Sequence, residues 1–556
     1  MIFMKKLFAI FLALISPSGI GSGQTSQSNM YINTVPQYEL DIKVLPDAHR
    51  LEANGTLRLP RANVSRAEIR LSLSELMQNF TVEVLEPAAS AGTVRIEKRD
   101  ASGSNVKWIV RPVRPIPAGE TVRLRFSYAG GERIANQFYI GSEVSFASAW
   151  GTDWYPLIDG ANDKGIGSLR FSVPAGQTVY ANGSHRGSTQ EAEQGISRFE
   201  IIHPTYFTFA AGNFNTTRRN GSVPIAAYLL KPRQHIERYL DNISRILDVL
   251  IKEFGKYPFD EFVIVEIPRD LALKASFIGA ATQGFVLLNS RAFDVPDVKY
   301  ALNFLGHEFS HQWFPHTVAL KTPPGLFMEE ALAEYGGLRV VEILSGDDAA
   351  EKYRRTGFEY DPYFSILEYF KLVGAGVDHP LGDLQRKPNH RELAYHKGFL
   401  VWNMLSREIG RERFQRILHS LTRRYAFREI GWNEFLHAIE KGAGRNLQWF
   451  YKQWFERAGA PDFQLTWRQD GRRLRGVISQ TSPYYQATLE IEAKNNQGQR
   501  LVRRVRVRDA RTSFTFPVNF SVESVTLDPH YLVLRWTPEY RNAARAARPP
   551  SQKVSQ

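Results

Sequence analysis

The chain has 556 residues, a formal net charge of +13 and no cysteine. Its length exceeds that of one ordinary domain, and its 35 Phe, 23 Tyr and 10 Trp exclude a largely disordered chain. The lack of cysteine excludes disulfides and thiolate ligands, so any bound metal must use His, Asp or Glu. The positive charge suits acidic surfaces, but it is also typical of basic soluble enzymes.

Residues 1–23 have the organisation of a secretory signal peptide. Lys5 and Lys6 precede the apolar run LFAIFLALI, and small residues follow near Gly21 and Gly23. The run is shorter than the roughly 20 residues that span a bilayer, although an uncleaved membrane anchor is the alternative. No later stretch is long and apolar enough to cross a membrane. Export without cysteine favours a secreted or periplasmic bacterial protein.

Short runs of alternating apolar and polar residues, separated by turns, predict an N-terminal β-domain over residues 31–220. Their regular spacing is typical of an antiparallel sandwich or a saddle-like sheet. The clearest expected strands are residues 38–45, 55–60, 81–87, 121–128 and 168–173.

Helical spacing of apolar residues marks a second domain, predicted over residues 221–460. It contains an amphipathic helix at residues 236–255 and then a strand at residues 262–267. Another helix is expected to open near residues 294–297 and to carry the sequence HEFSHQW, residues 307–313. The chain is therefore predicted to be an α+β multidomain protein.

Alternating strands return at Pro461 and predict a small C-terminal β-domain over residues 461–540, followed by a disordered basic tail, residues 541–556. In one of these strands Arg504, Arg506 and Arg508 form a charged face. Such a face is typical of a solvated strand. Contact with nucleic acid or an envelope polymer is the alternative, and export makes nucleic acid an unexpected partner.

HEFSHQW places His307 and His311 one turn apart on the same face of a helix. Two imidazoles at this spacing can bind one Zn²⁺, and Glu308 can reach a water on the metal. A catalytic zinc ion needs a third protein ligand, and Glu330, nineteen residues after His311, is the candidate. For so short a motif, the alternative is an ordinary helix with two surface histidines.

Together these motifs resemble the aminopeptidase N family of gluzincin zinc metallopeptidases. The resemblance is carried by HEFSHQWF, by the glutamate in LFMEEALAEY and by YHKG at residues 395–398. FGKYPFDEF, PTYFTFAAGNF and QWFERAGAPDF extend it over nearly all of residues 31–536. It implies a saddle-shaped β-domain, a thermolysin-like catalytic domain and a small β-sandwich, without the family's long C-terminal helical domain.

The resemblance also implies roles for single residues. His307, His311 and Glu330 bind one zinc ion per chain, Glu308 is the general base, and Tyr395 stabilises the oxyanion. The chemistry suits these groups, because zinc lowers the pKa of its bound water toward about 7 and polarises a carbonyl. A carboxylate can take the proton of that water and pass it to the leaving amine. The expected partner is a peptide or protein substrate.

One departure from the family pattern lies behind the metal site. A histidine that binds metal usually donates its other N–H to a carboxylate or carbonyl. The family's second glutamate, two turns after the third ligand, is Gly337 in this chain. Glu334, one turn after Glu330, is a candidate substitute, and a solvated helix glutamate is the alternative.

A second departure concerns the family's exopeptidase motif, Gly-Ala-Met-Glu-Asn. The candidate substrate-binding residues are its counterparts Gly279, Ala280, Ala281, Thr282 and Gln283. Thr282 occupies the position of the glutamate that binds the substrate's α-amino group, and a hydroxyl cannot replace that charge-assisted bond. The family's second acidic anchor is also missing, near Ala147 and Ser148. The backbone of this segment can still pair with an extended peptide.

The sequence therefore predicts a zinc metallopeptidase that is aminopeptidase-like by resemblance. Because amine recognition is altered, an endopeptidase or an enzyme for N-terminally blocked peptides is the first alternative. A protein that keeps zinc for binding without turnover is the second, although Glu308 and Tyr395 have no purpose in binding alone.

Overall fold

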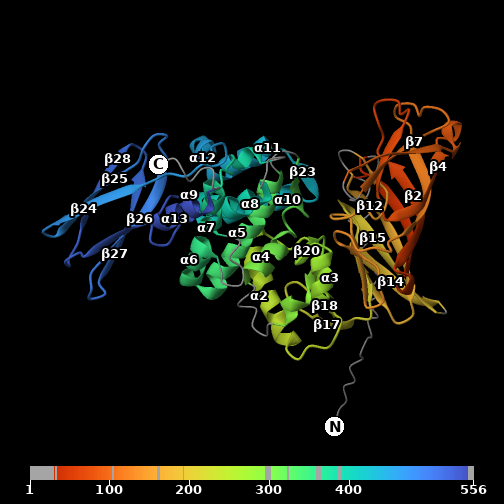
Figure 1. Cartoon of the computed structure of the whole chain (residues 1–556), viewed down its shortest axis with the longest axis horizontal. Coiled ribbons are helices and arrows are strands. Elements are labelled where there is room, and N and C mark those ends of the chain that lie inside the picture. Colours follow the sequence, from red (N-terminus) through yellow and green to blue (C-terminus); the bar gives the residue numbers. More distant parts are fainter. Residues whose placement is uncertain are drawn as a thin grey trace, which may run out of the picture.

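The structure is a computed structural model that describes residues 31, 34–102, 105–159, 163–191, 193–294, 302–321, 325–357, 365–384 and 390–548. The predicted signal peptide, residues 1–23, lies outside these ranges. No helix among the described residues has the length and apolar character needed to cross a membrane. A β-rich N-terminal part, a helical middle part and a β-rich C-terminal part follow one another along the molecule (Figure 1).

The N-terminal part consists of three sheets around one apolar core. The largest sheet has the strand order β14 (Ser184–Glu191), β15 (Gln194–Thr205), β12 (Gly165–Pro174), β1 (Gln37–Leu45), β2 (Arg50–Leu59), β8 (Val122–Gly130), β4 (Met77–Glu86) and β5 (Gly92–Thr93). The second is β13 (Thr178–Ala181), β16 (Thr208–Gly212), β10 (Val144–Ser148) and β9 (Phe138–Tyr139). The third is β11 (Leu157–Ile158), β3 (Ile69–Ser74), β7 (Asn105–Arg111) and β6 (Arg95–Ser102).

Alternation of apolar and polar residues explains the largest sheet. In β1, Tyr38, Leu40, Ile42 and Val44 are buried, while the residues between them are more exposed. All five strands expected in this region are found, in β1, β2, β4, β8 and β12, with only Pro60, Pro87 and Thr121 of the expected ranges lying just outside them. The sheet is not wholly antiparallel, because β1 pairs with β12 in parallel.

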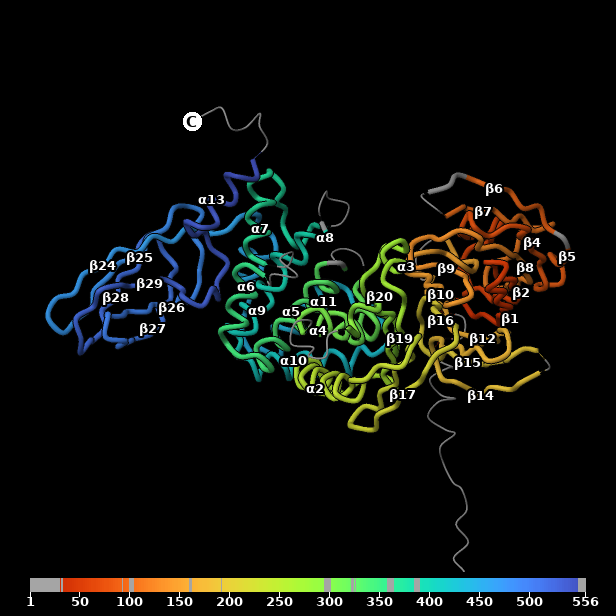
Figure 2. The backbone as a smooth tube through the Cα atoms, turned by 60° about the horizontal axis from the view of Figure 1, so that its bottom comes forward, coloured from red at the N-terminus to blue at the C-terminus, as the bar shows by residue number. Residues whose placement is uncertain are grey.

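The middle part begins with a five-stranded sheet. Its order is β17 (Asn215–Arg219), β18 (Ile225–Leu229), β19 (Phe262–Ile267), β21 (Phe285–Asn289) and β20 (Gly279–Thr282). The predicted strand at residues 262–267 is thus confirmed. The predicted domain boundary after residue 220 falls inside this sheet, because β17 pairs with β18 in an antiparallel hairpin. β20 is an edge strand, and Figure 2 shows it on the side that faces β10 and β16.

Helices form the rest of the middle part. They are α2 (Ile236–Phe254), α3 (Arg269–Lys274), α4 (Leu302–Ser310), α5 (Gly325–Ser345), α6 (Asp347–Thr356), α7 (Ile366–Gly374), α8 (His390–Leu393), α9 (Phe399–Ile409), α10 (Arg411–Arg424), α11 (Trp432–Ala443) and α12 (Gln448–Trp454). The predicted helix ending at Gly255 is confirmed as α2, and Gly255 has the positive φ of 105° that favours glycine. Residues 295–301, which include most of the segment 294–297 in which the second helix was expected to open, lie outside the described residues.

Helices α4 and α5 approach each other closely at three glycines. A Cβ atom on Gly306 would lie 2.9 Å from the Cα of Gly337, and one on Gly336 would lie 2.0 Å from the Oγ of Ser310. A Cβ on Gly337 would lie 2.6 Å from the carbonyl oxygen of Asn303. The glutamate that the family has at this position therefore has no room here, and the contact brings the two helices together.

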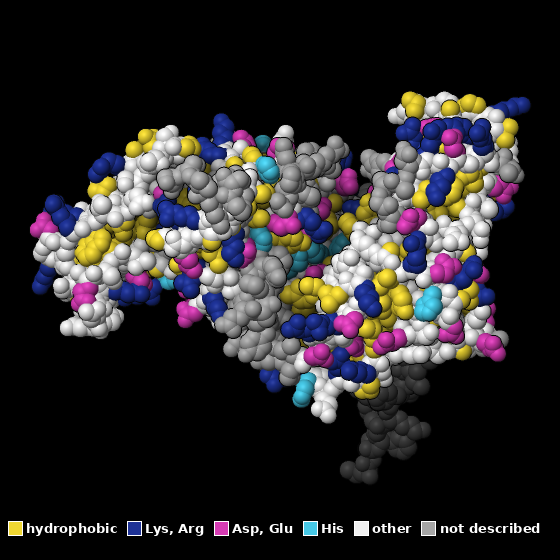
Figure 3. Space-filling view, in the orientation of Figure 1, with side chains coloured by type: hydrophobic (Ala, Val, Ile, Leu, Met, Phe, Trp, Pro, Cys, Tyr) yellow, Lys and Arg dark blue, Asp and Glu magenta, His cyan; other side chains and the backbone are white. Residues whose placement is uncertain are grey.

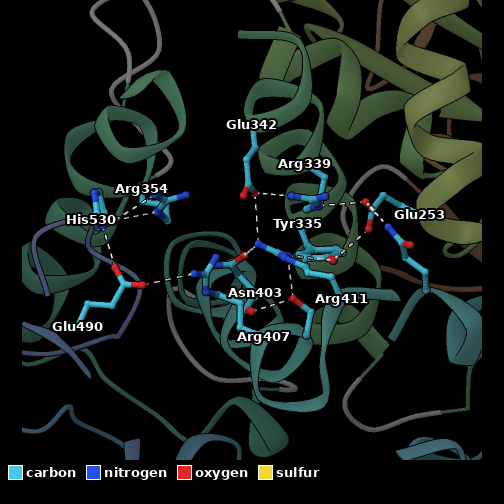
Figure 4. Close-up of polar contacts among 12 residues, drawn as sticks. Glu253, Tyr335, Arg339, Glu342, Arg354, Asn403, Arg407, Arg411, Glu490 and His530 are labelled. Atoms are coloured by element: carbon cyan, nitrogen blue, oxygen red, sulfur yellow. Dashed lines mark hydrogen bonds and ion pairs between the residues drawn. The ribbon is translucent and has the colours of Figure 1, made fainter. Parts of the chain in front are cut away.

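A buried polar network holds α5 against its neighbours and reaches the C-terminal part (Figure 4). The fully buried Glu253 of α2 accepts hydrogen bonds from Tyr335 Oη at 3.1 Å and from Arg339 Nε at 3.0 Å. Farther along, Arg354 of α6 donates to the backbone carbonyl of His530 at 3.0 Å, and His530 contacts Glu490 at 2.8 Å. Charges buried in this way are stable only while they stay paired.

The C-terminal part has two three-stranded antiparallel sheets. They are β24 (Gln464–Asp470), β25 (Arg473–Ser479) and β28 (Arg511–Pro517), and β27 (Arg500–Val507), β26 (Ala487–Lys494) and β29 (Ser524–Leu527). On β27, Val505 and Val507 are buried, and Arg504 pairs with Glu490 at 3.0 Å. Contact of this charged face with a polymer stays an alternative to a solvated face.

The expected disorder of residues 541–556 is wrong for its first half. Helix α13 (Pro538–Ala547) extends through it, and the hydroxyl of Thr537 caps the helix by accepting a hydrogen bond from the backbone N–H of Tyr540. The ring of Tyr540 stacks on Phe370 of α7 at a centroid distance of 4.9 Å. A single buried aromatic residue fixes the helix, and such a residue gives no periodic signal. Residues 549–556 lie outside the described residues.

Candidate metal centre and active site

Helices α4 and α5 bring the three predicted metal ligands together. The Nε2 atoms of His307 and His311 are 3.1 Å apart, and each lies 3.5 Å from Oε2 of Glu330. One ligand atom from each residue lies within 4.8 Å of the others, a spacing that one metal ion can bridge. His311 directly follows the last residue of α4. Histidine side chains are visible in the hollow between the helical and N-terminal parts (Figure 3).

The other ring nitrogen of each histidine is also held. Nδ1 of His307 lies 2.9 Å from Oε2 of Glu334, and Nδ1 of His311 lies 2.9 Å from the carbonyl oxygen of Phe314. These partners direct both Nε2 atoms toward Glu330. Glu334 is only 1% exposed, so the alternative of a solvated helix glutamate is wrong.

The charges at the site suit a divalent cation. Burial opposes protonation of His307, but its hydrogen bonds to Glu330 and Glu334 outweigh burial and raise its pKa to about 10. Burial raises the pKa of Glu330, but the hydrogen bond with His307 and the neighbouring charges lower it to about 2. Two carboxylates therefore stabilise positive charge at His307. One carboxylate and two imidazoles form a donor set that fits Zn²⁺.

Replacing Glu334 by alanine should lower the affinity for zinc by about 10- to 100-fold, because His307 loses the carboxylate that orients it. Competition with a chelator of known affinity measures the change. Glu334→Gln keeps the volume and one acceptor, so its loss should be smaller. Glu237→Ala, an exposed change in the first turn of α2, is the control. An unchanged affinity in Glu334→Ala would show that the contact does not support the metal.

Glu308 lies directly beneath the edge strand β20. A Cβ on Gly279 would lie 2.7 Å from Oε1 of Glu308, so only glycine allows the carboxylate to occupy this place. The side chain is 9% exposed, and burial raises its pKa to about 7. A peptide paired with β20 would pass directly over this carboxylate.

We expect Gly279→Ala to lower kcat for peptide hydrolysis by about tenfold or more, because the new methyl group displaces the Glu308 carboxylate. Thermal unfolding should change little, since the displaced atoms are the end of a flexible side chain. Gly431→Ala is the matched control, because no heavy atom lies within 4 Å of its Cβ position. Equal kcat values for both variants would contradict the expectation.

Tyr395 lies in a π-helical turn, Ala394–Gly398, between α8 and α9. Such turns often occur at functional sites. The hydroxyl of Tyr395 donates to Oε2 of Glu330 at 2.6 Å, which places it beside the metal ligands. Two residues on, the fully buried Lys397 contacts Asp378 Oδ1 at 3.5 Å and fixes the turn from below.

The segment Gly279–Gln283 is held by neutral hydrogen bonds. The side-chain amide of Asn182 donates to Oγ1 of Thr282 at 2.9 Å and to the carbonyl of Gln283 at 3.0 Å. The amide of Gln312 donates to the carbonyl of Thr282 at 2.8 Å. Gln283 donates to the carbonyl of Pro204 at 3.0 Å. Thr282 is fully buried, so its hydroxyl joins two parts of the chain. The predicted roles of these five residues in substrate binding stay predictions.

Sequence reasoning missed two residues of this site. Gln312 directly follows His311, and nothing in the motif indicates that it fixes β20. Arg391 lies one turn before Tyr395, and its Nη2 is 3.3 Å from Oε1 of Glu330. Its distance from the tyrosine, four residues along a helix, was the one available signal.

Comparison with known proteins shows where the family resemblance lies. Residues 239–454 match the family described as "Peptidase family M1 domain". The chain is 20% identical over 468 residues to the probable aminopeptidase 1 of Sulfurisphaera tokodaii, a match covering 78% of this chain and 59% of that protein. It is 23% identical over 357 residues to aminopeptidase N of Lactococcus lactis subsp. lactis, covering 60% and 40%. The chain thus spans about half the length of these relatives.

Solved structures share the fold. An M1 zinc metallopeptidase mutant from Deinococcus radiodurans, bound to a Tyr-Ser-Ala substrate, matches with a TM-score of 0.59 at 19% identity, covering 76% of this chain and 94% of that chain. The order of a β-rich part, a helical part and C-terminal strands fits this neighbour. Residues 239–454 therefore match a peptidase family M1 domain, and the relatives and the shared fold support the resemblance to aminopeptidase N-type gluzincins that the motifs indicated.

Proposed function

We propose that this protein hydrolyses peptide bonds with a water molecule activated on one zinc ion, held by His307, His311 and Glu330. The observation that carries the proposal is the convergence of these three ligands, with Glu308 and Tyr395 beside them. When bound, zinc polarises the scissile carbonyl and lowers the pKa of its water.

The residues of this chain supply the remaining steps. The edge strand β20 pairs with the extended peptide and brings its carbonyl over Glu308. Glu308 accepts the proton of the attacking water and passes it to the leaving amine. The hydroxyl of Tyr395 turns from Glu330 to the developing oxyanion, where a positioned donor contributes a few kcal/mol.

An aminopeptidase-like cut is the first candidate, because the relatives carry that name. One observation favours a second candidate, an endopeptidase or an enzyme for N-terminally blocked peptides. Thr282 stands where the family has its amine-binding glutamate, and its buried hydroxyl accepts a hydrogen bond from Asn182. A neutral, occupied hydroxyl offers no anchor to an ammonium group.

Three measurements test the proposal. Zinc content of the purified protein should approach one ion per chain, and a chelator should abolish hydrolysis. An alanine amide with a free amine, assayed beside the same amide N-acetylated and extended by two residues, separates the two candidates. Activity on the free amine alone would reject the second candidate. Inactivity across a broad peptide panel, with zinc bound, would reject the proposed peptidase activity and favour a protein that binds zinc without turnover.

The proposal includes export to the periplasm or the medium through residues 1–23. It also includes the saddle-shaped, thermolysin-like and sandwich domains that the family resemblance implies. Mass determination of the N-terminus of protein recovered from the periplasm tests the export. An intact Met1 in that fraction would contradict cleavage of the signal peptide.

A further inference from the structure

A cation lies at the mouth of the metal site. Arg391 approaches Glu330 from the side opposite the histidines, with its Nη2 at 3.3 Å from Oε1, while Oε2 faces both histidines and Tyr395. The Arg391 side chain is 61% exposed, whereas that of Glu330 is 12% exposed. The guanidinium therefore contacts Glu330, and also Tyr395, while most of the Arg391 side chain stays exposed.

Neutralisation of Glu330 does not explain this placement. A bound metal ion would already provide positive charge at Oε2, and a second cation beside a metal ligand competes with the metal electrostatically. As an exposed ion pair with Glu330, Arg391 would also contribute little to stability. The exposed planar fork with its five N–H donors is instead suited to a second, external carboxylate.

The other charges near β20 point the same way. Three carboxylates of the site already have other contacts. Glu330 belongs to the ligand cluster, Glu334 contacts His307, and Glu308 lies under Gly279. The amine-binding position is the neutral Thr282. The cleft has thus lost an anchor for a substrate cation and holds a cation of its own.

From this arrangement we infer that Arg391 is a specificity-determining residue that binds a carboxylate of the peptide substrate. The inference rests on the proposed peptidase function. Each residue of an extended peptide spans about 3.3–3.6 Å, so a carboxylate on Arg391 lies within about two residues of the scissile bond. This carboxylate is either an acidic side chain or the C-terminus of a short peptide.

Two pairs of substrates test the inference and separate these sources. The first pair is N-acetyl-trialanine with a free or an amidated C-terminus. The second is an amidated N-acetyl peptide with Glu or Gln beside the scissile bond. In at least one pair, wild type should prefer the carboxylate member by about 10- to 100-fold in kcat/KM, the range of a charge-assisted bidentate bond.

In Arg391→Gln this preference should fall to about one, and Arg391→Lys should keep only part of it, because an ammonium lacks the planar fork. Arg186→Gln is the matched control, since Arg186 is an exposed arginine that pairs with Glu200 on β14 and β15, away from the cleft. A loss of the same size for both members of each pair would overturn the inference and make Arg391 a positioning residue. So would equal kcat/KM values in wild type.

A binding measurement keeps the inference separate from catalysis. Zinc-loaded Glu308→Gln, titrated calorimetrically, should bind the carboxylate peptide about tenfold tighter than the amide, and the added Arg391→Gln change should remove the difference. Equal affinities in Glu308→Gln would overturn the inference. Selective binding without hydrolysis by wild type would instead overturn the proposed function and leave the role of Arg391 standing.

Discussion

Replacing Glu308 by glutamine should lower kcat for peptide hydrolysis by about 10²- to 10⁴-fold, the usual contribution of general acid–base catalysis. Glutamine has the same shape and fits under Gly279, but its amide cannot accept the proton of the attacking water. The metal ligands are untouched, so zinc content should stay at the wild-type level. Steady-state kinetics together with metal analysis of the same preparation measure both quantities.

Glu237→Gln is the control for Glu308→Gln, because it removes the charge of an exposed glutamate on α2. Its kcat should equal that of wild type. A Glu308→Gln protein with wild-type kcat and full zinc content would show that another group takes the proton. Loss of zinc would show instead that Glu308 supports the metal site.

Removing the hydroxyl of Tyr395 should lower kcat by about 10²- to 10³-fold and change KM little, because the hydroxyl acts on the oxyanion formed in the transition state. In the structure this hydroxyl donates at 2.6 Å to Glu330, one of the residues that would hold the metal. Kinetics of Tyr395→Phe on one peptide over a range of concentrations separate kcat from KM.

The matched control is Tyr425→Phe, which removes a hydroxyl that donates to an exposed glutamate, Glu434, at 2.8 Å. Its kinetics should equal those of wild type. If Tyr395→Phe raises KM and leaves kcat unchanged, the hydroxyl binds the substrate in the ground state, and the oxyanion role is wrong.

Local patterns predicted the parts of this protein that local forces determine. The apolar spacing of α2 and the β-branched run of β19 gave their residues correctly, because both patterns have the period of their own element. The spacing of His307, His311 and Glu330 also predicted the observed cluster. Two histidines one turn apart can bind one ion, and a catalytic zinc ion needs a third protein ligand.

Contacts between distant residues could not be predicted in this way. Glu334 is an unremarkable helix residue until α4 packs on α5 and buries it against His307. Asn182 and Thr282 are one hundred positions apart, and their hydrogen bond follows from how two sheets meet. The helix α13 depends on the packing of Tyr540 against Phe370. No period in the sequence encodes these contacts.

The hydrogen bonds of Asn182 determine the smallest piece of this protein that can work. A fragment cut at residues 239–454 would contain all three predicted metal ligands, Glu308 and Tyr395. It would lack Asn182 and the Pro204 carbonyl, which hold Thr282 and Gln283, and also the strands β17 and β18. Such a fragment keeps the chemical groups but lacks the hydrogen-bond partners that hold the segment Thr282–Gln283 in place beside them. The unit needed for the proposed activity is therefore larger than the family-matched domain, residues 239–454.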